Sequence, residues 1–173
     1  VADGSARPDL VAADLLAQAE HDPFSIPVLI TDSEELAGEV NRELARMASE
    51  LGLEKRVARA LKNGGIFVLP SIDDCILEAD RLAPEHLELF VRDARRRARK
   101  LKSYGALFVG ERSAEVFGDY ASGTNHVLPT CATARFFSAL WVGTFMLARY
   151  RLEVSEPARL IETTVRLAEA EGL

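Results

Sequence analysis

Short apolar runs alternate with longer segments of helical period through most of this chain, and this alternation restricts the possible folds more than any other feature. With helices between them, we expect strands at 26–30, 66–69, 86–91 and 105–110. Strands separated by helices pair in parallel through right-handed crossovers. The pattern therefore predicts an α/β fold, with a Rossmann-like parallel sheet layer over 1–137 that is followed by a helical tail over 138–173.

The predicted helices begin and end at typical cap residues. Apolar residues from Leu36 to Leu51 recur every three or four positions, as on one face of a helix, and Gly52 follows them. Asp9 and Ser71 are candidate N-caps, and Thr31, Asp32 and Ser33 each offer a cap for the helix over 36–51. We expect the remaining helices at 9–21, 54–61, 71–79, 93–103, 140–150 and 156–172.

The charge of the chain argues against a nucleic-acid partner. Its formal net charge is −6 and its isoelectric point is about 5.2, whereas binding to phosphates needs a concentrated basic face. The basic cluster over 92–102 alternates with Ala and Leu, so we interpret it as the solvated face of a helix. A membrane is not expected as a partner either, because no apolar run approaches the ~20 residues that a spanning helix needs.

The two cysteines, Cys75 and Cys131, do not make a disulfide framework, so we expect free thiols and a cytoplasmic location. Cys131 is interpreted as structural rather than as a nucleophile. The first residues lack the basic and apolar regions of a signal peptide, and there is no initiator Met. We therefore interpret the chain as an excerpt or a processed product.

All three histidines lie beside acidic or carboxamide side chains. Imidazole titrates near neutral pH and is the commonest metal ligand. Gln18 and His21 are three residues apart on a predicted helix, so both lie on one face, as in half of a helical metal site. A polar helix end that faces solvent is the alternative interpretation.

Glu85 and His86 follow Pro84, where we expect a helix to give way to a strand. At such a break both side chains can border one cavity. An acid next to an imidazole suits proton transfer in a dehydrogenation or a hydrolysis. The alternative is an ordinary histidine at the edge of a strand.

A polar loop that contains glycines, over 111–135, is the third candidate segment. An ordered loop of about two dozen residues is more often functional than not, and polar groups with glycine hinges suit the wall of a pocket. A solvated surface loop is the alternative. The sequence has no phosphate-binding loop, dinucleotide-binding glycine motif or nucleophile elbow. The polar residues of the loop are Glu115, Asp119, Tyr120, Ser122, Asn125 and His126.

Taken together and in order, these segments resemble the histidinol dehydrogenase family. The resemblance covers essentially the whole chain, at the right spacings. It implies the zinc-dependent, NAD+-linked oxidation of L-histidinol to L-histidine, the last step of histidine biosynthesis. The matching segments are Val11–His21, Ala83–Leu89, Gly118–Thr130, Thr133–Phe136 and Leu167–Leu173.

The resemblance also implies roles for single residues. Gln18, His21 and Asp119 would be zinc ligands, and zinc would mainly orient the amine and imidazole of the substrate. His86 would take the alcohol proton, and Glu85 would help to activate water for the second oxidation. The implied substrate contacts are Glu115, Asp119, Tyr120, His126 and Glu171.

The chain departs from the family in three respects. The family enzyme is more than twice as long, and this chain resembles its C-terminal half, so we expect much of the NAD+ site to lie in the other half. In the family, a histidine beyond the position of Leu173 is the fourth zinc ligand, and the other subunit of a homodimer donates it together with the Glu171 position. Cys131 and Ala132 replace a glycine pair, and Thr124 replaces a proline. Losing the glycines strains the loop if either position requires a positive φ.

Three functions stay open at this point. The chain is part of a histidinol dehydrogenase, a non-catalytic module that binds zinc or an imidazole-like ligand, or a related NAD-dependent dehydrogenase of another amino or sulfonated alcohol. The last helix has one apolar stripe. We predict that this helix either swaps across a dimer or docks on its own sheet.

Overall fold

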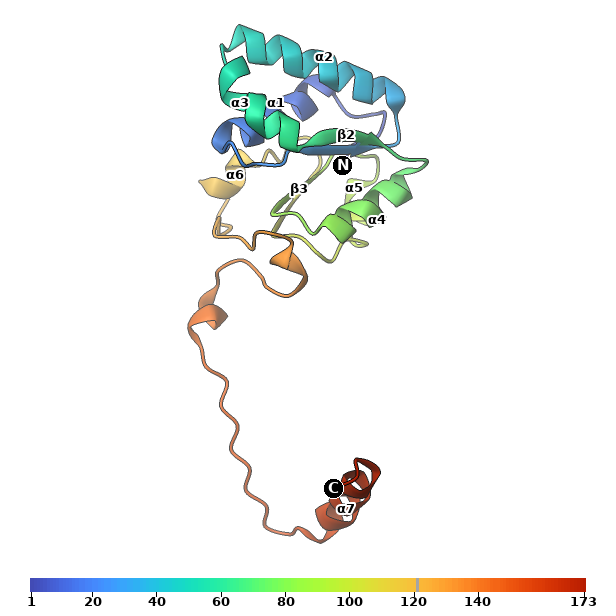
Figure 1. Ribbon diagram of the computed structural model, residues 1–173, viewed down its shortest axis with the longest axis vertical. Helices are drawn as coiled ribbons and strands as arrows, with labels where there is room; N and C mark the ends of the chain where they lie inside the picture. The colour runs from blue at the N-terminus through green and yellow to red at the C-terminus, as the bar shows by residue number, and fades with distance from the viewer. Residues whose placement is uncertain (121) are drawn as a thin grey trace. The chain divides into compact units, whose positions relative to one another are not determined.

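A computed structural model describes residues 1–120 and 122–173 (Figure 1). It divides into two compact units, 1–141 and 142–173. The first contains α1 (Pro8–His21), β1 (Val28–Thr31), α2 (Glu34–Glu50), α3 (Glu54–Asn63), β2 (Gly65–Val68), α4 (Ile72–Leu82), β3 (His86–Leu89), α5 (Ala94–Ala98), β4 (Ala106–Val109), α6 (Val116–Asp119) and the 3₁₀ turn η1 (Thr133–Arg135). The second contains the 3₁₀ turn η2 (Val142–Phe145) and α7 (Ala158–Ala170).

The strands of the first unit form parallel pairs that the beginning of the chain joins. β1 pairs with β2, and β3 pairs with β4. Ala2 makes parallel bridges to both Thr31 and Phe90. The strand order is therefore β2, β1, residues 1–3, β3, β4, which is the 3-2-1-4-5 order of a doubly wound fold. The prediction of a Rossmann-like parallel sheet is confirmed.

Two apolar cores cover the two faces of this sheet, one formed with α1, α2 and α3 and the other with α4 and α5. Leu87 and Leu89 of β3 pack in the core with α4, whereas Phe90 packs in the core with α1. Side chains alternate between the faces of a strand. His86 and Glu88 therefore point to the same face of the sheet as Phe90, which is the face that α1 covers.

Glycine is required at two places where a helix or loop leads into a strand. A Cβ atom at Gly64 would overlap the carbonyl oxygen of Pro27, and a Cβ atom at Gly105 would lie 2.5 Å from the carbonyl oxygen of Glu85. The second contact matters for function because Glu85 directly precedes His86. The backbone at the start of β3 is thus held against the backbone at the start of β4.

Ser71 is confirmed as an N-cap, Ser33 is the cap among the three candidates before α2, and the prediction for Asp9 is wrong. The Ser33 side chain accepts a hydrogen bond from the N–H of Leu36, and the Ser71 side chain accepts one from the N–H of Asp74. Asp9 is not a cap, because α1 already begins at Pro8 and Asp9 lies in its first turn. Proline suits this first position, since its missing N–H would have no partner inside the helix.

The predicted helix over 93–103 is much shorter in the structure, where α5 ends at Ala98. The amides of Lys102 and Ser103 donate instead to Oδ1 of Asp80, at 2.5 and 2.8 Å. In a longer helix these two N–H groups would donate to carbonyls of the preceding turn, but here the Asp80 side chain of α4 accepts them. A tertiary contact therefore overrides the local preference.

The predicted helix over 140–150 is wrong, since this segment contains only the short turn η2. Its large apolar side chains, such as Phe145 and Leu147, are 78% and 81% exposed. Short helices are marginal on their own, so the periodic pattern alone does not form one here. The final predicted helix is present as α7. In the part of the chain that the structure describes, no helix is long and apolar enough to cross a membrane.

Candidate active site

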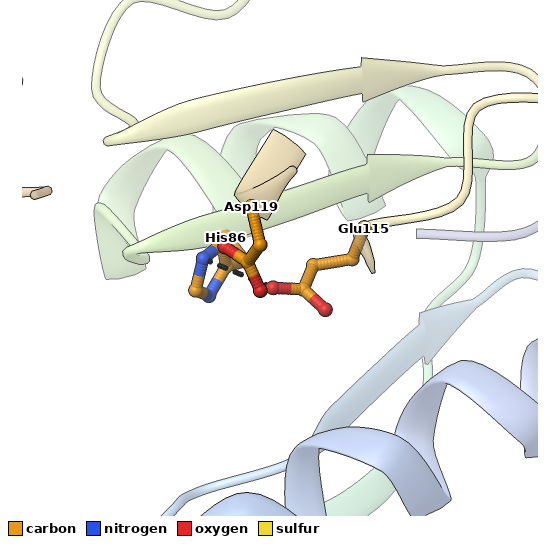
Figure 2. Close-up of side chains that lie close together, drawn as sticks. All are labelled: His86, Glu115 and Asp119. Carbon is orange, nitrogen blue, oxygen red and sulfur yellow. Dashed lines mark ion pairs between the residues drawn. The ribbon is translucent and has the colours of Figure 1, made fainter. Parts of the chain in front are cut away.

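The candidate site is centred on a contact between His86 and Glu115. Nε2 of the imidazole lies 3.3 Å from Oε1 of the carboxylate, and the two side chains are only 21% and 12% exposed. Asp119 lies beside them, and one ligand atom from each of the three side chains falls within 4.8 Å of the others. Figure 2 shows the two carboxylates beside the imidazole ring. The arrangement combines a titratable nitrogen with two acidic oxygens.

Different elements supply these three groups. His86 is the first residue of β3, Glu115 directly precedes α6, and Asp119 ends α6. A single turn of helix places residues four positions apart on one face, so α6 presents Glu115 and Asp119 together. The segment that follows β4 therefore places two carboxylates beside the amino end of β3.

Phe108 of β4 supports both sides of the cluster. Its ring centroid lies 6.2 Å from that of His86, at an interplanar angle of 39°. A Cβ atom at Gly118 would lie 3.0 Å from the same ring, so α6 sits close against it. The hydroxyl of Thr124 donates to the Gly118 carbonyl at 3.1 Å. The aromatic ring and the following loop together hold α6 next to the imidazole.

The electrostatics of Glu115 connect the cluster to α1. Burial raises the pKa of the Glu115 carboxyl above its ordinary value. His86 opposes this shift, Asp119 adds to it, and His21 of α1 opposes it. His21 thus lies within electrostatic range of the cluster, although the two residues are far apart in sequence.

A second carboxyl pair joins α1 to β3 next to this cluster. The side chains of Asp14 and Glu88 are hydrogen-bonded to each other. Burial, reinforced by the charge of Asp14, raises the pKa of Glu88 to about 8, and burial also raises the pKa of Asp14. The hydrogen bond favours the ionised form of Asp14 and the protonated form of Glu88. Burial therefore favours a pair that keeps one shared proton between the two carboxyls.

Neither member of this pair is among the residues predicted for the site from the sequence. The available indications were positional: Asp14 lies four residues before Gln18 on the same helical face, and Glu88 lies two residues after His86 on the same strand face. Neither spacing distinguishes a buried acid from a solvated one. Only the packing of α1 on the sheet brings the two carboxyls together.

The other candidate residues lie around the cluster with different exposures. Gln18 is half-buried and His21 exposed at the end of α1, and Tyr120 and His126 are exposed in the loop that follows α6. Glu171 belongs to the second unit, where it follows α7.

Glu85, Ser122 and Asn125 have structural contacts. The Glu85 carbonyl accepts from the N–H of Ala106 at 2.8 Å, Ser122 and Thr124 share a hydroxyl hydrogen bond of 3.0 Å, and Oδ1 of Asn125 accepts from the N–H of Val127 at 2.8 Å.

Two neighbouring residues of the loop adopt a conformation that favours glycine. Cys131 and Ala132 have φ values of 53° and 60°, in the left-handed region. Side chains with a Cβ atom adopt this conformation at a cost of roughly 1–2 kcal/mol per residue.

The carboxyl ends of the strands, opposite the ends that carry the His86 cluster, border a separate crevice. Doubly wound folds bind ligands outside the carboxyl ends of their strands, at the point where the strand order reverses. Here that point has a cavity of about 330 Å³, lined by Ser5, Phe90, Val91, Gly110, Glu111 and Arg112. Oε1 of Glu111 accepts from the N–H of Arg7 at 2.8 Å, at the beginning of α1. A carboxylate therefore occupies the position where a dinucleotide phosphate binds in related folds.

Comparisons with known proteins assign the chain to one family. The family model for histidinol dehydrogenase matches residues 1–173. The histidinol dehydrogenases of Caldanaerobacter subterraneus and Methanopyrus kandleri are each 44% identical to this chain, over all of it and 41% of the relative. The crystal structure of the enzyme from Elizabethkingia anophelis matches with a TM-score of 0.84 and 36% identity, covering 99% of this chain and 40% of that one. The chain thus spans about two fifths of the length of these relatives.

Proposed function

Because this chain belongs to the histidinol dehydrogenase family, we propose that it forms the zinc- and substrate-binding part of an enzyme that oxidises L-histidinol to L-histidine. The observation that carries this proposal is the contact of His86 with Glu115, with Asp119 beside it. A half-buried imidazole that is held by a carboxylate suits the transfer of a proton from an alcohol.

His86 takes the hydroxyl proton of the substrate in this proposal. The carboxylate of Glu115, 3.3 Å away, stabilises the imidazolium that forms. Glu85, the preceding residue, assists the water that adds to the aldehyde before the second oxidation. Each oxidation removes one hydride and one proton, and two NAD+ supply the hydride acceptors.

Gln18, His21 and Asp119 are the proposed zinc ligands. Imidazole nitrogen and carboxylate oxygen are ordinary donors to Zn²⁺, and a carboxamide oxygen completes the protein set. The pairing of His86 with Glu115 supports this division, because it leaves His86 for proton transfer. Bound zinc would orient the amine and the imidazole of the substrate.

The remaining substrate contacts are proposed for Glu115, Tyr120, His126 and Glu171. The first three lie in or beside the loop that carries Asp119. Glu171 follows α7, and we assign it to the site of a second copy in a homodimer. The exposure of the apolar side chains of α7 supports this assignment, since contiguous exposed apolar surface marks an interaction site.

NAD+ is proposed to bind mainly to the part of the family enzyme that this chain does not span. The crevice at the switch point supports this, because the backbone N–H of Arg7 at the start of α1 already donates to the carboxylate of Glu111. A pyrophosphate would meet a negative charge at this position. A cytoplasmic location suits the biosynthetic role of the family.

Calorimetry with zinc and L-histidinol, followed by an NADH absorbance assay, tests the proposal. We expect the chain to bind both ligands, and we expect NADH to form once the rest of the enzyme is joined to it. His21→Asn should weaken zinc binding, whereas His86→Asn should retain zinc and lose turnover.

The same measurements separate the rival functions. Failure to bind either ligand would remove the proposal. Tight binding without turnover in the joined enzyme would favour a non-catalytic module. Turnover of another amino alcohol in preference to histidinol would favour a related dehydrogenase.

A further inference from the structure

The Asp14–Glu88 pair has no part in the proposed proton transfer or zinc ligation, yet it joins the two elements that carry them. Asp14 lies one helical turn before Gln18 on α1, and Glu88 lies on the same face of β3 as His86. Their hydrogen bond thus links the ligand-bearing end of α1 to the strand that carries the imidazole.

Apart from the hydrogen bond between Arg7 and Glu111 at its beginning, α1 meets the sheet through buried apolar side chains. The buried residues of α1 are Val11, Ala12, Leu16 and Ala19. Apolar contacts of this kind are favourable but non-directional, so they hold the helix on the sheet without defining its position along the strand. A hydrogen bond between two short, half-buried side chains is directional.

We propose that Asp14 and Glu88 are positioning residues, whose hydrogen bond sets the register of α1 against β3 and thereby places Gln18 and His21 opposite His86. This inference rests on the proposed function, because it gives the pair a task in the zinc and substrate site. The pair acts through its neighbours and does not touch the substrate.

The donor and acceptor roles within the pair define the test. A hydrogen bond between two carboxyls needs one shared proton, and the N–H of a carboxamide can donate in its place, so Glu88→Gln should preserve the link to Asp14. Glu88→Ala and Asp14→Ala should both remove it. Val40→Ala is the matched control, because Val40 of α2 is fully buried in the apolar core that α2 shares with α1, so its truncation lowers stability but leaves both carboxyls in place.

Zinc affinity of the full chain, measured by competition with a chelating dye, is the first readout. Loss of a partner that orients metal ligands typically weakens metal binding about 10- to 100-fold. We expect a loss in this range for Glu88→Ala and Asp14→Ala, and a change of no more than about threefold for Glu88→Gln and Val40→Ala. Alanine variants that bind zinc like the wild type, or a Glu88→Gln variant as weak as Glu88→Ala, would overturn the proposal.

The second readout needs no metal and no substrate. The imidazole ¹⁵N and ¹³C resonances of His86, recorded by NMR on the apo chain, should shift in both alanine variants and return to the wild-type position in Glu88→Gln. Unchanged His86 resonances in the alanine variants would show that the pair serves stability alone. A wild-type chain that does not bind zinc would sink the proposed function, and these spectra would still decide the positioning role.

Discussion

The carbonyl oxygen of Glu85 lies so close to Gly105 that a Cβ atom added at position 105 would be only 2.5 Å from it. The contact joins the start of β3, where His86 lies, to the start of β4. The corresponding contact in the other strand pair joins Gly64, before β2, to Pro27, before β1. The two glycines thus have the same structural task, and only one of them lies beside the candidate site.

The first prediction uses this pair of glycines. Gly105→Ala and Gly64→Ala should each lower the free energy of unfolding by about 1–3 kcal/mol or more, as overpacking against a rigid neighbour does. Only Gly105→Ala should also weaken the binding of zinc and L-histidinol, because it displaces Glu85 and His86. Denaturation curves and calorimetry measure the two effects, and equal losses of binding in both variants would contradict the prediction.

The second prediction concerns the loop strain at Cys131 and Ala132. Glycine adopts a positive φ without the roughly 1–2 kcal/mol cost of a Cβ atom, although it also increases the entropy of the unfolded chain. Cys131→Gly and Ala132→Gly should therefore each raise the free energy of unfolding by about 0.5–1 kcal/mol. Gly110→Ala, at a φ of 86°, should change stability in the opposite direction. Urea denaturation of the three variants checks the signs, and a loss of stability in either glycine variant would refute the strain argument.

The third prediction is a pH dependence of stability that belongs to Glu88. Its pKa is raised from 4.5 to about 8 in the folded chain, so the folded state binds more protons than the unfolded state between these values. The stability that the protonated carboxyl contributes is therefore present at low pH and is lost as the pH rises towards 8. Glu88→Gln cannot ionise and should lack this decrease.

The measurement is the difference in unfolding free energy between wild type and Glu88→Gln across this pH range. The difference is needed because other groups of the chain also change protonation across this pH range. The variant should gain on the wild type as the pH rises. A pH-independent difference would mean that Glu88 is ionised in the folded chain throughout.

The fourth prediction concerns the assembly of α7. Ile161 and Val165 are four residues apart on this helix and are 55% and 49% exposed. Light scattering should show a dimer for the wild-type chain and a monomer for Ile161→Glu with Val165→Glu. Glu162→Gln, which removes the 2.7 Å ion pair with Arg166 on the neighbouring face, is the control and should stay dimeric. A strictly monomeric wild type would exclude the exchange of α7 between subunits.

Local pattern was sufficient for the architecture but not for every element. The alternation of apolar strands with helices predicted the parallel sheet, and Ser33 and Ser71 marked the beginnings of their helices. The expected helix over 93–103 was wrong beyond Ala98, because Asp80, distant in sequence, captures the amides of Lys102 and Ser103. The expected helix over 140–150 was wrong because helical period alone does not stabilise a short helix.

The sequence by itself determined the α/β class and the residue types of the candidate site, because period, cap residues and the neighbours of each histidine are local properties. Only the tertiary structure decided which of these residues meet. It placed Glu115 and Asp119 against His86, and it revealed Asp14 and Glu88 as partners. The physical reason is that a carboxyl's pKa and hydrogen bonds depend on the groups that folding packs around it, and those groups come from helices and strands far apart in the chain.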